Sequence, residues 1–322
     1  MRPSRIFFAS DVHGSDVTFR KFVNAARFYD VDTLVFGGDL MGKTLIPLVE
    51  QAGGRHVAEF QGSHHVVEDA DYLKALQKRV GDTGSYWAVM GPDEYDILAE
   101  DRGALEDLFR RLAAERLRAW VALAEERLAG STVRLFLTGG NDDDPAVLPV
   151  LDEAPTEHVV SCERRVVELD DEHTMITIGF STPTPWDTAR EVSEEEMAEL
   201  IEDSMAGVPD PSRCVFNIHV PPIGSGLDLC IKVDTSTDPP SPLLVGGRPQ
   251  YTRGGSRSVL EAIRTYQPTA GLHGHIHESP GRIRYGRTKC FNPGSEYAQG
   301  VLNGLVLSIK GGKVLSYQHT SG

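Results

Sequence analysis

The sequence lacks any long hydrophobic run, which limits where the protein can work. Its first apolar segment, Ile6–Ala9, is followed closely by Asp11, whereas the hydrophobic region of a signal peptide takes about 7–15 residues. No segment approaches the roughly 20 apolar residues that span a membrane. We therefore expect a soluble, cytoplasmic protein without a membrane partner.

Basic residues are also fewer than acidic ones. The 322 residues include 32 Lys and Arg against 47 Asp and Glu, which gives a formal net charge of −15. Such a charge repels polyanions over about 8 Å at physiological salt and disfavours nucleic acid as a partner. A small phosphate ester remains compatible, because a bound cation dominates the field around it.

Cysteine is scarce and unpaired. The four cysteines form no C-x-x-C motif, and we expect reduced, buried thiols at Cys162, Cys214, Cys230 and Cys290. A hydrophobic content of 40% and a charged content of 25% are typical of a globular protein. The length fits one large domain, residues 1–322, that carries an insertion.

The beginning of the chain alternates between strand and helix. Ile6–Ala9 and Thr33–Phe36 are short apolar runs, and between them apolar residues recur at helical spacing from Asp16 to about Tyr29. Strand, helix and strand in this order predict a βαβ unit of an α/β fold. In such units functional residues gather at the carboxyl ends of the strands.

Residues 44–131 interrupt this alternation. We expect a hairpin from Leu45–Glu50 and Arg55–Phe60, a helix over Asp69–Val80, and one or two helices over residues 93–129. This pattern predicts a mainly helical insertion beside the core. Because the insertion begins just after Asp39, we expect it to form a wall or lid of the site. Its adjacent histidines, His64 and His65, either reach over that site or form an exposed pair in a loop.

The second half of the chain returns to short strands. We expect a hairpin from Val166–Leu169 and Thr174–Gly179, an acidic surface helix over Glu194–Met205, and a helix that begins at Ser256. The segment Pro221–Arg253 is rich in proline and glycine, which predicts a long surface loop.

Residue types that bind metals follow five predicted strands, which are Ile6–Ala9, Thr33–Phe36, Val133–Leu137, Val215–Ile218 and Ala270–Leu272. In chain order these residues are Asp11 and His13, Asp39, Asn141, His219, and His275 with His277. Carboxylate, amide and imidazole ligands together suit Mn²⁺, Fe²⁺ or Zn²⁺. Because the carboxyl ends of strands in an α/β sheet meet at one edge, the pattern predicts a metal centre there.

Taken together, Asp11-x-His13, Gly38-Asp39, Gly140-Asn141-Asp142, His219 and Gly274-His275-x-His277 resemble the successive motifs of the calcineurin-like metallophosphoesterases. The resemblance implies a four-layer α/β/β/α sandwich that hydrolyses a phosphate ester with a hydroxide bridging two divalent ions. The implied cofactors are Mn²⁺, Fe²⁺/Fe³⁺ or Zn²⁺.

The resemblance also implies a division of the ligands between the two ions. Asp11, His13 and His277 would hold the first ion. Asn141, His219 and His275 would hold the second. Asp39 would bridge both, since one carboxylate between two cations reduces their repulsion.

One position departs from the pattern of many members. Asp142 stands where they carry a histidine as the acid for the leaving group. With a pKa near 3.9, Asp142 would be ionised at neutral pH and would repel the substrate, unless its pKa is raised or His273 serves instead. The nearby Lys43 either meets a phosphate or is simply solvated.

This departure leads us to expect a phosphodiesterase more than a phosphatase, because a diester carries one negative charge and a monoester dianion two. A nuclease or nucleotidase of the same superfamily, or a metal-binding scaffold with weak catalysis, remains as an alternative.

Overall fold

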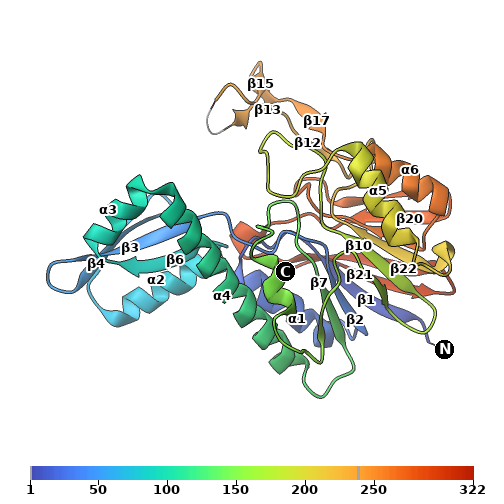
Figure 1. Cartoon of the computed structure of the whole chain (residues 1–322), viewed down its shortest axis with the longest axis horizontal. Helices are drawn as coiled ribbons and strands as arrows, with labels where there is room; N and C mark the ends of the chain where they lie inside the picture. Colours follow the sequence, from blue (N-terminus) through green and yellow to red (C-terminus); the bar gives the residue numbers. More distant parts are fainter. Residues whose placement is uncertain (1, 238–239) are drawn as a thin grey trace.

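The computed structural model describes residues 2–237 and 240–322, which form two six-stranded sheets that face each other (Figure 1). In spatial order the first sheet consists of β22 (Lys313–Ser321), β21 (Asn303–Lys310), β1 (Ser4–Ala9), β2 (Thr33–Phe36), β7 (Arg134–Leu137) and β8 (Val159–Ser161). Strands β1, β2, β7 and β8 run parallel, and β21 and β22 complete the sheet in antiparallel pairing.

The second sheet repeats this plan. In spatial order its strands are β19 (Gly281–Tyr285), β20 (Thr288–Asn292), β18 (Ala270–Leu272), β11 (Cys214–Ile218), β10 (Thr174–Ile178) and β9 (Val166–Glu168). The four central strands are parallel, and β9 and β19 pair antiparallel at the edges. The predicted hairpin of β9 and β10 is therefore confirmed.

The structure has four layers, two of helices and two of sheets, and an apolar cluster fills each of the three spaces between them. Fully buried side chains such as Phe8 and Phe291 fill the space between the sheets. Helices α1 (Asp16–Phe28) and α4 (Arg102–Leu128) pack on the outer face of the first sheet, whereas α5 (Glu194–Met205) and α6 (Arg257–Tyr266) cover the second. The predicted α/β/β/α sandwich is confirmed. None of the helices in the described part of the chain is both long and apolar enough for a membrane span.

A smaller sheet lies beside the sandwich (Figure 1). In spatial order its strands are β5 (Ser63–Val67), β4 (Arg55–Phe60), β3 (Leu45–Gln51) and β6 (Tyr86–Met90), and it is accompanied by α2 (Ala70–Asp82) and α3 (Pro92–Glu100). The β3–β4 hairpin and the helices confirm the predicted elements, but β5 and β6 were not predicted. Helix α4 links this part to the core, since Trp120 in its second half stacks on Phe19 of α1 with ring centroids 4.2 Å apart.

The segment predicted as a long loop, Pro221–Arg253, instead contains three short ladders. They pair β12 (Leu229–Ile231) with β17 (Tyr251–Arg253), β13 (Val233–Asp234) with β14 (Ser241–Pro242), and β15 (Leu244–Val245) with β16 (Arg248–Pro249). The Gly246-Gly247 turn has φ values of 59° and 76°, which match a tight two-residue hairpin. The composition of a segment so rich in turn residues does not show which of its residues pair as strands.

Candidate metal centre

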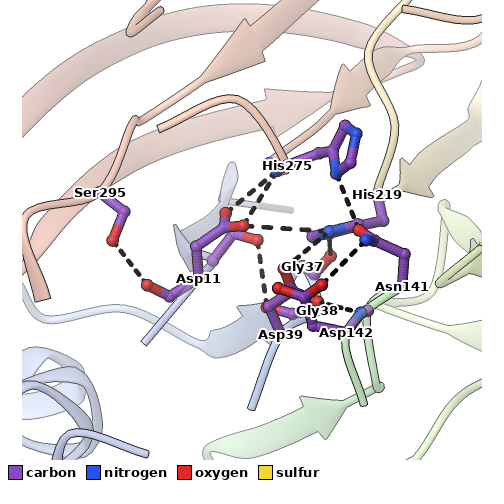
Figure 2. Close-up of polar contacts among 12 residues, drawn as sticks. Asp11, Gly37, Gly38, Asp39, Asn141, Asp142, His219, His275 and Ser295 are labelled. Atoms are coloured by element: carbon purple, nitrogen blue, oxygen red, sulfur yellow. Dashed lines mark hydrogen bonds and ion pairs between the residues drawn. The ribbon is translucent and has the colours of Figure 1, made fainter. Parts of the chain in front are cut away.

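The predicted ligands meet where the central strands of both sheets end. Asp11 and His13 follow β1, Asp39 follows β2 and Asn141 follows β7, all in the first sheet. His219 follows β11 of the second sheet, and His275 and His277 follow β18. Figure 2 shows the side chains of Asp11, Asp39, Asn141, His219 and His275 drawn together at this edge.

The backbone of these loops adopts conformations that ordinary residues avoid. Asp11, His13, Asp39 and His275 have φ values of 59°, 40°, 59° and 68°, in the left-handed region. Such conformations each cost of order 1–3 kcal/mol and persist where the surrounding structure enforces them, often at functional sites. Hydrogen bonds between neighbouring loops help to hold these backbone conformations. The Asp11 N–H donates to the Gly38 carbonyl oxygen (2.9 Å), and the His13 N–H donates to the Asp39 carbonyl oxygen (3.0 Å).

Glycine allows the two sheets to approach at the site. A Cβ on Gly274 would collide with the hydroxyl of Ser10 and with the carboxylate of Asp11. The absence of a side chain therefore lets the loop after β18 lie against the loop after β1. The backbone N–H of His275 uses this proximity to donate a hydrogen bond to Asp11 Oδ1 (3.0 Å).

The first group of ligands has the spacing of a metal site. Asp11, His13, Asp39 and His277 each offer a ligand atom within 4.8 Å of the others. His13 Nε2 lies 3.0 Å from His277 Nε2 and 3.5 Å from Asp39 Oδ2, and His277 Nε2 lies 3.4 Å from Asp11 Oδ1. Ligands that are each about 2.1 Å from one ion are roughly 3–3.5 Å apart, so these donors fit a single ion.

A second group adjoins it through Asp39. His219 Nε2 lies 3.4 Å from Asp39 Oδ2, and His275 Nδ1 lies 2.8 Å from Asn141 Oδ1. The other ring nitrogen of His219 is 2.8 Å from the Gly37 carbonyl oxygen, which directs Nε2 toward the site. This Nε2 is buried and lacks a hydrogen-bond partner among the described residues, as expected of an atom placed to bind a metal.

The histidines differ in how burial and charge act on them. Burial lowers the pKa of His13 to about 3 and that of His275 to about 4, which keeps both rings in the neutral form that binds metals. Burial also acts to lower the pKa of His219, but the carboxylates of Asp39 and Asp11 outweigh it and raise that pKa to about 9. Two bound cations would replace this proton as partners of the carboxylates.

Two supporting residues were not predicted. The fully buried Asp143 accepts hydrogen bonds from the backbone N–H groups of Leu40, Met41 and Gly140 at 2.7–2.9 Å. The hydroxyl of Thr188 lies 2.8 Å from Asn141 Nδ2 and thereby leaves the amide oxygen of Asn141 directed at His275. The contacts of Asp143 with Leu40 and Met41, and that of Thr188 with Asn141, join segments far apart in the chain, so no local pattern could have indicated them.

Tyr297 also contacts the centre, from the short 3₁₀ helix η3 (Tyr297–Gln299). Its ring centroid is 4.7 Å from that of His13 and 6.0 Å from that of His277. Gly84 of the insertion lies against the same place, because a Cβ there would collide with the His13 carbonyl oxygen and approach the Tyr297 ring. The smaller sheet therefore meets the core directly beside a predicted metal ligand.

The prediction that His64 and His65 reach over the site or form an exposed loop pair is wrong. Both belong to β5, the edge strand farthest from β6 in the smaller sheet. His65 is buried with Nδ1 2.9 Å from the Tyr72 hydroxyl, and His64 Nδ1 is 2.5 Å from a Glu59 carboxylate oxygen. Alternating strand geometry places one ring in the insertion core and the other in solvent.

His273 makes its contacts away from the ligand cluster. The residue is fully buried, with Nδ1 2.8 Å from the Ile218 carbonyl oxygen and Nε2 beside Gly271 within the sheet. Burial lowers its pKa to about 4. A ring held in this way is a structural part of the sheet, which counts against the sequence-based hypothesis that His273 donates a proton to the leaving group.

Asp142 does not present an uncompensated carboxylate. Its Oδ2 forms an ion pair with Lys43 Nζ, and the same oxygen is 3.9 Å from His13 Nδ1. Its backbone N–H donates to Asp39 Oδ1 (3.1 Å). Lys43 is half exposed, as expected of a solvated lysine, but its ammonium group pairs with Asp142 and so offsets the repulsion expected from that carboxylate.

Solved structures align with this chain over nearly its whole length. One crystal structure aligns over 99% of this chain and 98% of its own, with 16% identity and a TM-score of 0.60. The protein TT1561 of Thermus thermophilus aligns over 99% and 98% (12% identity, TM-score 0.49), and a dimetal phosphatase from Danio rerio over 99% and 99% (8% identity, TM-score 0.45). No family model matches the sequence, and no curated protein matches it.

The two facing sheets and their outer helices define the fold as an α/β/β/α sandwich, with a buried Asp and His cluster at the ends of its central strands. The five motifs that resemble those of the calcineurin-like metallophosphoesterases thus lie at one edge of this fold, where they include a buried Asp and His cluster.

Proposed function

We propose that the chain hydrolyses small phosphate esters, with phosphodiesters preferred, at a centre of two metal ions chosen from Mn²⁺, Fe²⁺/Fe³⁺ and Zn²⁺. Asp11, His13 and His277 would hold the first ion and Asn141, His219 and His275 the second, with Asp39 shared. Ions held in this way supply Lewis acidity toward phosphoryl oxygens and an activated water.

The position of Asp39 carries this proposal. Its Oδ2 lies 3.5 Å from His13 Nε2 in one ligand group and 3.4 Å from His219 Nε2 in the other. A single buried carboxylate oxygen between two sets of imidazole donors is difficult to explain by structural needs alone, because such histidines usually find backbone or side-chain partners. It is the arrangement that two neighbouring cations require.

The remaining side chains of the site have supporting roles. The Thr188 hydroxyl and the Gly37 carbonyl orient Asn141 and His219, which fixes the ligand atoms before a metal enters. The formal charge of −15 favours a small substrate over a nucleic acid, so a nuclease activity ranks below hydrolysis of a small diester.

The test is reconstitution with each metal followed by assays against aryl phosphodiesters, phosphomonoesters and nucleotides. Asp39→Asn should lose metal and activity together, because it removes the shared charge, whereas His275→Ala should mainly weaken the second ion. Elemental analysis would refute the assignment if Asp39→Asn kept both ions and full activity. Two ions bound without any turnover would instead identify a scaffold with weak or no catalysis.

A further inference from the structure

The entrance of the metal centre carries an exposed cation that the proposed ligand set does not use. Lys43 lies between β2 and β3, where the chain leaves the core for the insertion, and its side chain is 49% exposed. Its ammonium group pairs with Asp142, whose side chain is only 15% exposed. Lys43 thus reaches from solvent to the rim of the ligand cluster.

Other cations near the ligand loops are already engaged. Arg116 Nη1 donates to the Gly14 carbonyl oxygen (2.5 Å), and Arg190 Nη1 donates to the Gly140 carbonyl oxygen (2.9 Å). Their side chains are 11% and 4% exposed, so both are parts of the loop structure. Of these three cations, Lys43 is the one with an exposed side chain, so its charge is the one accessible from solvent.

The pair is adjacent to the place where a phosphate would bind. Asp142 Oδ2 is 3.9 Å from His13 Nδ1, and the Asp142 N–H contacts the shared carboxylate of Asp39. At such distances one unit of charge changes the binding of an anion substantially, because charges a few ångströms apart near a protein surface are only partly screened by solvent.

We propose that the Lys43–Asp142 ion pair sets the charge of the phosphate that the metal centre accepts. The pair is neutral as a whole, so it supplies no surplus positive charge for the second negative charge of a phosphomonoester. A phosphodiester carries a single charge and needs no such surplus. This inference rests on the proposed phosphoesterase function and names the pair, with Lys43 contributed by the start of the insertion, as its specificity-determining element.

A double-mutant cycle tests the proposal, because the two single variants change the charge of the pair in opposite directions and the double variant restores it. Lys43→Met leaves the pair at −1, Asp142→Asn leaves it at +1, and the double variant is neutral like the wild type. We expect the kcat/KM ratio of monoester to diester to fall about tenfold or more in Lys43→Met and to rise by a similar factor in Asp142→Asn. The double variant should return to within about threefold of the wild-type ratio.

Binding provides a readout independent of turnover. Calorimetry on metal-loaded protein, at a pH well above the second pKa of inorganic phosphate, should give dissociation constants for inorganic phosphate as the dianion and for dimethyl phosphate as the monoanion. The dissociation constant of the dianion should change more with the charge of the pair than the dissociation constant of the monoanion does. Lys43→Arg keeps the charge and should keep the wild-type ratio, which separates charge from the loss of the lysine stem.

Matched controls lie at the opposite end of the sheets. Lys313→Met and Asp171→Asn make the same charge changes at exposed positions near the other ends of the strands, and both should leave the ratio unchanged. Equal metal content in all variants is required for the comparison. A wild type without phosphoesterase activity under any metal would overturn the proposed function, whereas normal turnover with an unmoved ratio in both single variants would overturn the role of the pair.

Discussion

Asp143 accepts a backbone hydrogen bond from Leu40, the residue directly after the shared ligand Asp39. Its Oδ2 binds the N–H groups of Leu40 (2.9 Å) and Gly140 (2.7 Å), so one buried carboxylate oxygen joins the loop after β2 to the loop after β7. The position of Asp39 relative to Asn141 therefore depends on a residue outside the proposed ligand set.

Asp143→Asn should reduce both stability and metal affinity. An amide retains one acceptor oxygen and presents an N–H₂ group, so at least one buried backbone donor loses its partner at a cost of about 1–3 kcal/mol. Denaturant unfolding and metal titration measure the two effects. Asp144→Asn is the control, since the acceptor for the Ala146 N–H survives and the surface ion pair with Arg110 contributes little. Equal behaviour of the two variants would contradict the role of Asp143.

Gly84→Ala should disturb the centre from the insertion. Gly84 has a φ of 91°, and a Cβ there would collide with the His13 carbonyl oxygen. We expect a lower Tm and weaker binding of the first ion, because His13 must move. Gly62→Ala is a matched control with a φ of 71° and nothing within 4 Å of the added Cβ, so it carries backbone strain without the collision. If both variants bound metal equally, the insertion would not support His13.

Glu194 should make the stability of the protein depend on pH. Its carboxylate accepts hydrogen bonds from the Ser256 hydroxyl (2.6 Å) and from the N–H groups of Arg257 (2.8 Å) and Ser258 (3.0 Å) at the start of α6. Burial raises its pKa, but these hydrogen bonds outweigh burial and lower it below the ordinary value of 4.5. The stabilisation is therefore complete above the unfolded pKa and is lost as pH falls through the folded pKa.

The variant Glu194→Gln tests the direction in which stability changes with pH. The Tm of the variant should lie below that of the wild type at neutral pH, and the difference should shrink as the pH falls below about 4. Glu195→Gln, at the exposed neighbouring position, is the control and should change the Tm little at neutral pH. A difference for Glu194→Gln that stayed constant from neutral to acidic pH would exclude this linkage.

The proposed ligands could be predicted because each follows an apolar strand, and the ends of such strands must converge in an α/β fold. Asp143 could not be assigned, because two of its three partners, Leu40 and Met41, lie in another loop that only the folded sheet brings close. Tyr297 was missed for the same reason, since its contact with His13 joins the two ends of the chain. The strand β5 was missed because it pairs along the β4 edge, and pairing is not visible in a short mixed sequence such as Ser63–Val67.

Asp142 and Lys43 also bear on the departure of the leaving group. An alkoxide needs a proton as it departs, and a positioned acid contributes about 10²–10⁴-fold to the rate. Asp142 stands where many members of the superfamily have a histidine, and its carboxylate is committed to Lys43. Burial acts to lower the pKa of Lys43, but Asp142 and Asp39 outweigh it and raise that pKa above 10.5, which makes the ammonium group a poor proton donor at neutral pH.

Aryl esters should therefore be cleaved far better than alkyl esters, because a phenolate of low pKa leaves without much help. Matched aryl and alkyl phosphodiesters carry the same charge, so their kcat/KM ratio reports the need for an acid and not the charge of the substrate. Asp142→His should raise the rate for the alkyl diester relative to the aryl diester by about tenfold or more. Metal content must match in both proteins. An unchanged ratio in Asp142→His would place position 142 outside the reach of the leaving oxygen, and the proton would then have to come from another group.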